Sequence, residues 1–151
     1  MRIFAALLIT VSLPAMGQQK TYTGFPSVVW PKLYAIAYVK SQDRYGDYEK
    51  PVFTETVKQL DNQTIVLPGY MVPFENGNTG NRFMLTSLPL NACYFCGVGG
   101  PETVVEVFLK NVISYTDKPV EVRGILKLND TDPDQMIYRL EQAEFLGVID
   151  F

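Results

Sequence analysis

The chain has 151 residues, the size of one domain, and its 13 basic and 16 acidic residues give a net charge of −3. This acidic balance disfavours nucleic acid and other polyanions as partners. The sequence contains no histidine, which removes the commonest general base, the usual catalytic triads and most catalytic zinc sites, so an enzyme is not expected. Aromatic residues at 13%, with 11 glycines and 10 prolines, favour strands and turns over helices.

The N-terminal segment has the composition of a cleavable signal peptide. Arg2 supplies the positive charge, and an apolar run from Ile3 to Leu13 is followed by a proline and small residues that suit a cleavage site. This run of about 11 residues is shorter than the roughly 20 that a membrane-spanning helix needs. We therefore expect residues 1–17 to be removed, leaving residues 18–151 as a single periplasmic or secreted domain with no membrane span. Without Arg2, 12 basic residues face 16 acidic ones, a net charge of −4.

The first part of the predicted domain combines one strand, an exposed loop and one short helix. Bulky residues from Leu33 to Val39 predict the strand, and the charged residues from Lys40 to Lys50 predict the exposed loop. Apolar residues at helical spacing between Phe53 and Leu60 predict a short helix, with Thr54 as its N-cap. No other segment predicts a helix.

Five further strands, separated by Asn, Gly, Asp and Pro clusters, make up the rest of the chain. Gly69 and Gly124 interrupt two of these strands, as expected where a short sheet bends to close on itself. The predicted fold class is therefore all-β with one short helix, in the form of a small five-stranded barrel plus an N-terminal strand. The five strands are expected at Thr64–Val72, Arg82–Leu88, Thr103–Lys110, Pro119–Leu128 and Met136–Leu146.

The strand pattern also predicts the core of the barrel. Side chains alternate between the two faces of a strand, so apolar residues at alternate positions face inward. The residues selected in this way are Ile65, Leu67, Val105, Val107, Val122, Leu126 and Leu140.

The sequence contains one chemical motif, Cys-x-x-Cys-Gly, formed by Cys93, Cys96 and Gly97. In an oxidising compartment the two cysteines would form a local disulfide that braces their loop. Alternatively they would supply half of a metal site, with zinc as the expected ion and Gly97 turning the backbone so that both thiolates face it. Glu102 and Glu106 share one face of a predicted strand and are the candidates for further ligands, as is the same motif from a second chain.

A third interpretation is a thiol–disulfide oxidoreductase, in which a helix N-terminus normally lowers the pKa of the first cysteine. Here the motif is followed by Gly97, Gly99, Gly100 and Pro101, which shape a loop and would stop a helix. A pair of free thiols without a role is the fourth interpretation, and the sequence leaves all four open.

Several segments of the chain occur together in one family. They are Leu60–Asn62, the Gly-Tyr-Met-Val-Pro strand within Leu67–Pro73, the Cys-x-x-Cys-Gly-x-x-Gly-Pro-Glu loop within Ala92–Glu102, Val122–Asn129 and Tyr138–Glu144. In this combination the chain resembles, from Trp30 to Glu144, a family of exported bacterial proteins of unknown function common in the Bacteroidetes. The strand order and the in-strand glycines resemble an OB-type barrel. The resemblance carries over no catalytic residue, but it implies a role near transporter components or metal handling.

The sequence as a whole thus favours an exported, non-enzymatic OB-like binding or accessory module. Its contact surface would be the loop from Cys93 to Glu102, and its partner a ligand, a metal ion or an envelope protein. The alternative is a periplasmic redox protein that uses Cys93 and Cys96, and a third possibility is a structural subunit whose disulfide only braces the loop. No feature of the sequence indicates an oligomeric state.

Overall fold

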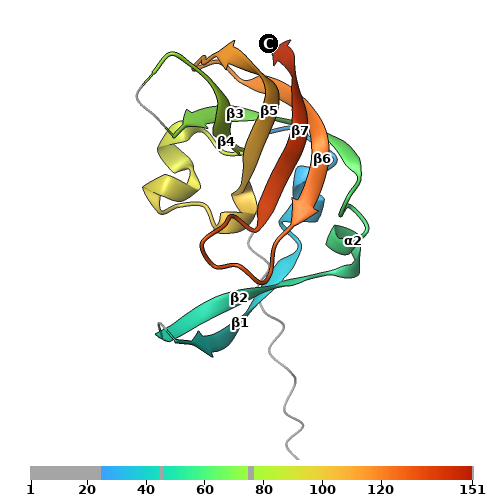
Figure 1. Cartoon of the computed structure of the whole chain (residues 1–151), viewed down its shortest axis with the longest axis vertical. Helices are drawn as coiled ribbons and strands as arrows, with labels where there is room; N and C mark the ends of the chain where they lie inside the picture. Colours follow the sequence, from blue (N-terminus) through green and yellow to red (C-terminus); the bar gives the residue numbers. More distant parts are fainter. Residues whose placement is uncertain (1–24, 45, 75–76, 151) are drawn as a thin grey trace, which may run out of the picture.

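The architecture is that of a computed structural model, which describes residues 25–44, 46–74 and 77–150, except for the side chains of Asp43 and Cys96. The predicted signal peptide, residues 1–17, lies outside these described residues. Figure 1 shows the described chain as a barrel with a separate two-stranded hairpin beneath it.

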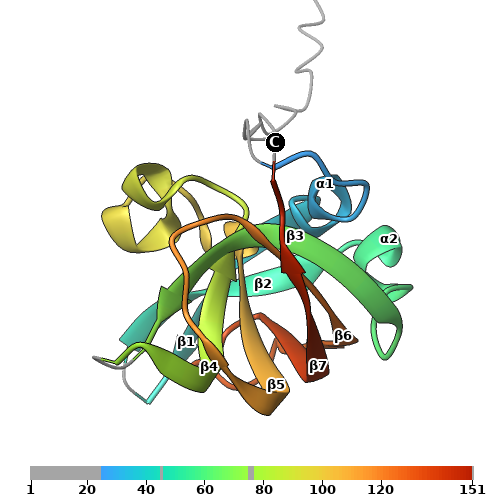
Figure 2. The same ribbon diagram turned by 90° about the horizontal axis from the view of Figure 1, so that it is seen from above.

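Five strands form a closed barrel in the order β3-β4-β5-β7-β6, and β6 returns to pair with β3 (Figures 1 and 2). Neighbouring strands are antiparallel except β5 and β7, which run parallel. This small all-β barrel confirms the predicted OB-like fold class. The strands are β3 (Thr64–Pro73), β4 (Thr79–Thr86), β5 (Val104–Ser114), β6 (Val120–Leu128) and β7 (Tyr138–Val148), each close to its predicted range.

The barrel interior is filled by the apolar residues that the strand alternation predicts. All seven predicted core residues are buried, and Leu67, Leu126 and Leu140 have no exposed surface. Both in-strand glycines lie where neighbouring strands come close. A Cβ at Gly69 would lie 2.6 Å from the backbone oxygen of Thr86, and a Cβ at Gly124 would lie 2.8 Å from Cγ of Leu140. Close approach of two strands therefore explains why both positions are glycine.

The segment before the first strand is helical, which the sequence analysis missed. Helix α1 (Trp30–Leu33) has a proline in its first turn, where the missing N–H costs nothing. The indole of Trp30 donates a hydrogen bond to the backbone oxygen of Pro68 at 2.7 Å, and the backbone oxygen of Leu33 accepts one from Tyr138 at 2.7 Å. The predicted strand at Leu33 was therefore wrong at its start, because Leu33 belongs to a helix that packs into the barrel core.

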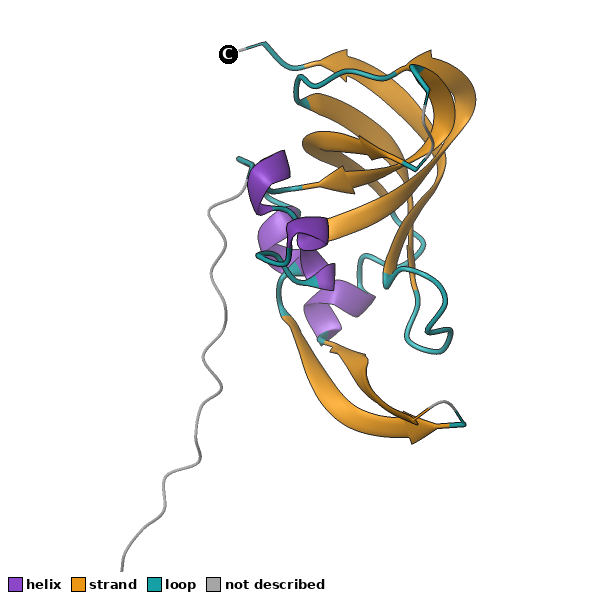
Figure 3. Ribbon diagram, turned by 90° about the vertical axis from the view of Figure 1, so that its left-hand side faces the viewer, coloured by secondary structure: helices purple, strands orange, loops and turns teal. Residues whose placement is uncertain are grey.

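The exposed loop predicted over Lys40–Lys50 is also wrong, because this stretch forms most of a β-hairpin. Strand β1 (Ile36–Asp43) pairs with β2 (Gly46–Phe53) in antiparallel register. The predicted N-terminal strand is thus one half of this hairpin. The hairpin forms its own sheet outside the barrel (Figure 3). Apart from buried Phe53, its described side chains are exposed or half-buried, so charged residues fit along both strands.

The predicted helix after the hairpin is present. Helix α2 (Glu55–Lys58) begins after Thr54, whose side chain accepts a hydrogen bond from the backbone N–H of Val57, and Val57 is buried. The N-cap prediction at Thr54 is therefore confirmed. The expectation of a single helix is wrong, since α1 and α2 are both present in the described chain.

Candidate functional site

The segment that connects β4 to β5, residues 87–103, contains the predicted motif and is hereafter the Cys loop. Its two ends are held together by a hydrogen bond from the backbone N–H of Ser87 to the backbone oxygen of Thr103 at 3.0 Å. Proline and glycine residues between these ends interrupt regular helix, so the Cys loop forms short 3-10 turns instead of one longer helix. The turns are η1 (Leu90–Ala92), η2 (Tyr94–Cys96) and η3 (Pro101–Thr103).

Four buried apolar residues in the Cys loop or in the adjoining strands lie outside the core cluster of the barrel. Cys93 is only 3% exposed, and Met84, Leu88 and Val104 are also buried, yet none of the four belongs to the core cluster of the barrel. Cysteine in such surroundings packs as a small hydrophobic side chain. No disulfide is found among the described side chains, and the side chain of Cys96 is not one of them. The disulfide, metal and redox interpretations therefore stay predictions.

Gly97 turns the Cys loop directly after the motif. It ends η2 with a φ of 78°, in the left-handed region, and its N–H donates to the backbone oxygen of Tyr94 at 3.0 Å. Residues with a Cβ rarely adopt this conformation, so glycine suits the position.

Glu102, a predicted metal ligand, ties the Cys loop to the hairpin. Its side chain is nearly buried, at 6% exposed, and Oε2 accepts a hydrogen bond from the Tyr38 hydroxyl at 2.8 Å. Gly100 leaves room for this carboxylate, because a Cβ there would lie 2.4 Å from both carboxylate oxygens. The Gly-Pro-Glu part of the motif thus places a buried acceptor under the first strand of the hairpin.

The carboxylate of Glu102 also acts on two buried tyrosines. Burial raises the pKa of Tyr138 far above its usual range, and the negative charge of Glu102 raises it further. Burial raises the pKa of Tyr34 as well, with Glu102 acting in the same direction. Both phenols stay protonated near neutral pH, and that of Tyr138 donates to the backbone oxygen of Leu33. Tyr138 therefore serves as a neutral structural donor.

Glu106, the other predicted metal ligand, is engaged by an arginine on the outer wall of the barrel. Nε and Nη2 of Arg82 lie 2.7 and 2.5 Å from Oε1 of Glu106. The same guanidinium lies over the rings of Phe74 and Phe108, at 4.8 and 5.3 Å from their centroids. In the part of the chain that the structure describes, no three Cys, Asp or Glu side chains gather as a metal site would require. Zinc binding stays a prediction.

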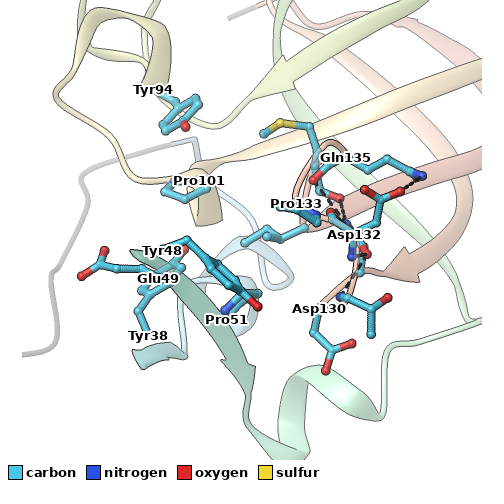
Figure 4. Close-up of a pocket in the computed structure, with 14 residues that line it drawn as sticks. Tyr38, Tyr48, Glu49, Pro51, Tyr94, Pro101, Asp130, Asp132, Pro133 and Gln135 are labelled. Atoms are coloured by element: carbon cyan, nitrogen blue, oxygen red, sulfur yellow. Dashed lines mark hydrogen bonds between the residues drawn. The ribbon is translucent and has the colours of Figure 1, made fainter. Parts of the chain in front are cut away.

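A groove lies where the Cys loop meets the hairpin and the β6–β7 loop, residues 129–137 (Figure 4). Its volume is about 270 Å³. Figure 4 shows Tyr94 of the Cys loop across the groove from Tyr48 of the hairpin, with Pro133 and Gln135 closing a third side. Segments far apart in the sequence therefore meet at one cavity, and the predicted motif supplies one of its walls.

Hydrogen bonds within the β6–β7 loop fix its shape. The side-chain oxygen of Asn129 accepts from the backbone N–H groups of Thr131 and Asp132 at 3.3 and 3.0 Å. Its side-chain nitrogen donates to the backbone oxygen of Asp132 at 2.7 Å. Asparagine favours turns because its side chain satisfies nearby backbone groups in this way. Asp130 and Pro133 therefore line the groove from a backbone that these hydrogen bonds hold in place.

The lining of the groove combines aromatic and apolar surface with a few polar groups. Tyr38, Tyr48 and Tyr94 contribute aromatic rings, prolines come from all three segments, and Met136 and Ile137 add apolar surface. Carboxylates and amides stand among them, whereas none of the lining residues is Cys, Ser or Lys. Apolar surface with a few polar groups is typical of ligand sites.

Most of this groove was missed by the sequence analysis. The Cys loop was identified by its cysteines, but residues 40–50 of the hairpin were assigned to an exposed loop and the β6–β7 segment was treated only as a turn. The run from Asn129 to Asp134, with four Asn or Asp side chains in six positions, was the signal that could have marked a structured loop.

The fold and the groove define a small OB-like barrel with an added hairpin and a structured Cys loop. Residues 31–145 match the family described as protein of unknown function DUF3299, and the chain belongs to this family. The matched range agrees with the extent of the resemblance seen in the sequence. Among solved structures, the crystal structure of a DUF3299 family protein from Pseudomonas aeruginosa PAO1 at 2.45 Å resolution is similar. It shares 22% identity over 67% of this chain and 68% of that chain, with a TM-score of 0.49.

No curated protein matches the sequence. Within residues 25–44, 46–74 and 77–150, none of the helices has the length and apolar character needed to cross a membrane.

Proposed function

We propose that this DUF3299 domain is a non-enzymatic binding module whose ligand sits in the groove between the Cys loop, the hairpin and the β6–β7 loop. The observation that carries the proposal is the convergence of these three segments on one aromatic cavity. The hairpin lies outside the barrel sheet, so it is an addition to the five-stranded barrel. The hairpin and the Cys loop are nevertheless joined by the hydrogen bond between Tyr38 and Glu102.

The position of the groove on the barrel supports a binding role by analogy. In OB barrels, the loop between the fourth and fifth strands flanks the site that holds the ligand. Here that loop is the β6–β7 segment, and it lines the groove through Asp130, Pro133 and Gln135. This is an argument from fold alone, and it concerns where a ligand binds and not which ligand it is.

The burial of Cys93 supports a structural role for this residue in the Cys loop over the redox alternative. A reactive thiol needs access to its substrate, and Cys93 is almost completely buried. The part of the Cys loop that faces the groove is formed by Tyr94 and Pro101 instead. In this proposal Cys93 and Gly97 shape the Cys loop, and the groove makes the contact.

Export is part of the proposal and rests on the sequence of residues 1–17. A mature protein that starts near Gln18 in an oxidising compartment would allow a disulfide in the Cys loop. N-terminal sequencing of the protein recovered from its native cell, with fractionation of membrane and periplasm, tests this. Retention of Met1 in a membrane fraction would contradict export. The Bacteroidetes-type origin suggested by the motifs belongs to the same proposal.

A fragment screen followed by nuclear magnetic resonance tests the groove without knowledge of its ligand. The isotope-labelled mature chain is titrated with a mixture of small aromatic and aliphatic compounds. We expect backbone shifts to change around Tyr48, Tyr94 and Met136, and Tyr94→Ala to remove these changes. The matched control is Val112→Ala, an exposed residue on β5, which should leave them intact. Shift changes that fall elsewhere, or that survive Tyr94→Ala, would overturn the proposal.

A further inference from the structure

The charge and the size of the groove narrow the class of ligand, and this inference rests on the proposed binding function. We propose that the groove takes a segment of a partner polypeptide in which Lys or Arg residues flank one apolar side chain. The apolar side chain would enter between Tyr48 and Tyr94, and the basic groups would meet the carboxylates of Glu49 and Asp130 at its rim.

The size and lining of the groove argue for a single apolar side chain. A volume of about 270 Å³ lies at or below the lower end of the roughly 300–1,000 Å³ found for sites that hold a whole drug-sized ligand. Tyrosine and proline line the space, and grooves of aromatic residues receive extended, proline-containing segments in several peptide-binding domains. One anchored side chain within a longer chain fits these dimensions.

The charged residues that line the groove are all acidic. Glu49, Asp130 and Asp132 line it, and no Lys or Arg does. Among the described residues, Glu49 and Asp130 take part in no ion pair, and Lys40 lies opposite Glu49 in the hairpin register without pairing to it.

Three carboxylates on the barrel wall are different in this respect. Glu106, Glu141 and Glu144 are each paired with an arginine of the chain itself. Glu49 and Asp130 have no such partner among the described residues, so they can complement a basic partner at the groove. Tyrosine rings beside them add a favourable surface for guanidinium or ammonium groups.

The surface of the Cys loop favours a polypeptide over an oligosaccharide. Leu90, Phe95 and Val98 belong to the same loop as Tyr94 and are 42, 53 and 64% exposed. Exposed apolar side chains grouped on one loop are typical of protein-binding surfaces. An oligosaccharide would also stack on the tyrosines and donate hydrogen bonds to the carboxylates, but it would offer no apolar side chain to Leu90, Phe95 and Val98.

The test is a set of titrations of the mature chain by calorimetry at low salt. The probe is a blocked octapeptide in which a Leu-Pro pair is flanked on both sides by arginines. The first control peptide replaces each arginine with citrulline, which keeps the shape and removes the charge. The second replaces Leu-Pro with two glycines. Chitotetraose represents the oligosaccharide class.

We expect the arginine peptide to bind at least about 10-fold more tightly than either control peptide, and to weaken with added salt, because exposed charges are screened. Tyr94→Ala should weaken it about 10-fold, and the double variant Glu49→Gln, Asp130→Asn by about 3- to 10-fold, since each exposed ion pair contributes little on its own. Val112→Ala is the control. Equal binding of the arginine and citrulline peptides, or tighter binding of chitotetraose at the groove, would overturn the polypeptide inference while leaving the binding function intact.

Discussion

The hydroxyl of Tyr38 donates a hydrogen bond to Oε2 of Glu102 at 2.8 Å, across 64 residues of sequence. This contact links the hairpin to the Cys loop, two elements that share no sheet. An isolated two-stranded hairpin is marginally stable in water, so its position depends on contacts of this kind. At its base, Phe53 is buried and its ring packs on that of Tyr138 at 5.8 Å between centroids. The shape of the groove therefore depends on a few contacts made by the hairpin.

Tyr38→Phe should reduce the stability of the mature chain and loosen the hairpin. The change leaves a nearly buried carboxylate without one of its donors, which costs about 1 kcal/mol in the free energy of unfolding. The measurement is the urea midpoint, followed by the fluorescence of Trp30, the only tryptophan. Tyr48→Phe is the matched control, because the Tyr48 hydroxyl makes no hydrogen bond to any described residue. Equal midpoints for the two variants would contradict a linking role for Tyr38.

Leu67→Ala and Leu140→Ala should each destabilise the barrel by about 2–5 kcal/mol. Truncation of a fully buried leucine loses apolar contacts and leaves a cavity. Both side chains have no exposed surface, and they come from opposite ends of the barrel sequence. Chemical denaturation measures the loss. Val112→Ala, at a residue that is 66% exposed, should change the free energy of unfolding by no more than about 0.5 kcal/mol.

The barrel could be predicted from the sequence because alternating apolar residues recur along its strands. Alternation placed Leu67, Leu126 and Leu140 inward, and two glycines marked the close approaches between strands. The hairpin could not be predicted in the same way. Apart from Phe53, its described side chains are exposed or half-buried, so Lys40 and Lys50 lie in strands without the apolar alternation that identifies a strand.

The candidate site was predicted only where a rare residue type marked it. The cysteines drew attention to the Cys loop, and the role of Glu102 as a buried acceptor depends on Tyr38, which no local pattern connects to it. The sequence did not predict the short helix α1, because Trp30 and Leu33 are held by distant partners, the backbone oxygen of Pro68 and the hydroxyl of Tyr138, and not by helical periodicity. Contacts between distant segments thus decide the site, and a single sequence does not display them.

Acid should weaken the outer wall of the barrel through Glu144. Hydrogen bonds from Arg123 and Lys110 lower the pKa of Glu144 from 4.5 to about 2. Because the folded pKa lies below the unfolded value, this stabilisation is present above pH 4.5 and is lost as the pH falls through about 2. Glu144→Gln should therefore lower stability most near neutral pH, and the difference from wild type should shrink between these two values.

The measurement is the denaturant midpoint of wild type and Glu144→Gln between pH 7 and 2, repeated at about 1 M salt, where exposed pairs are strongly screened. Glu55→Gln, which removes a pair with Lys58 alone, is the control and should show a smaller effect. A difference between wild type and Glu144→Gln that is independent of pH would show that the carboxylate charge is not its cause.

Gly97→Ala should destabilise the Cys loop by about 1 kcal/mol, because alanine is strained at a positive φ. The φ of Gly97 is 78°, and a Cβ there would contact nothing within 4 Å, so the cost would come from the backbone and not from a clash.

The midpoint measured in oxidised, reduced and chelator-treated protein also separates the interpretations of the cysteines. If a disulfide braces the loop, the cost persists in oxidised protein, intact mass is lower by two hydrogens, and chelator has no effect. If zinc is bound, chelator lowers the stability of wild type and removes its advantage over Gly97→Ala. A Gly97→Ala variant that is more stable than wild type, and whose midpoint does not change with chelator or reductant, would show that the groove does not require the turn at Gly97.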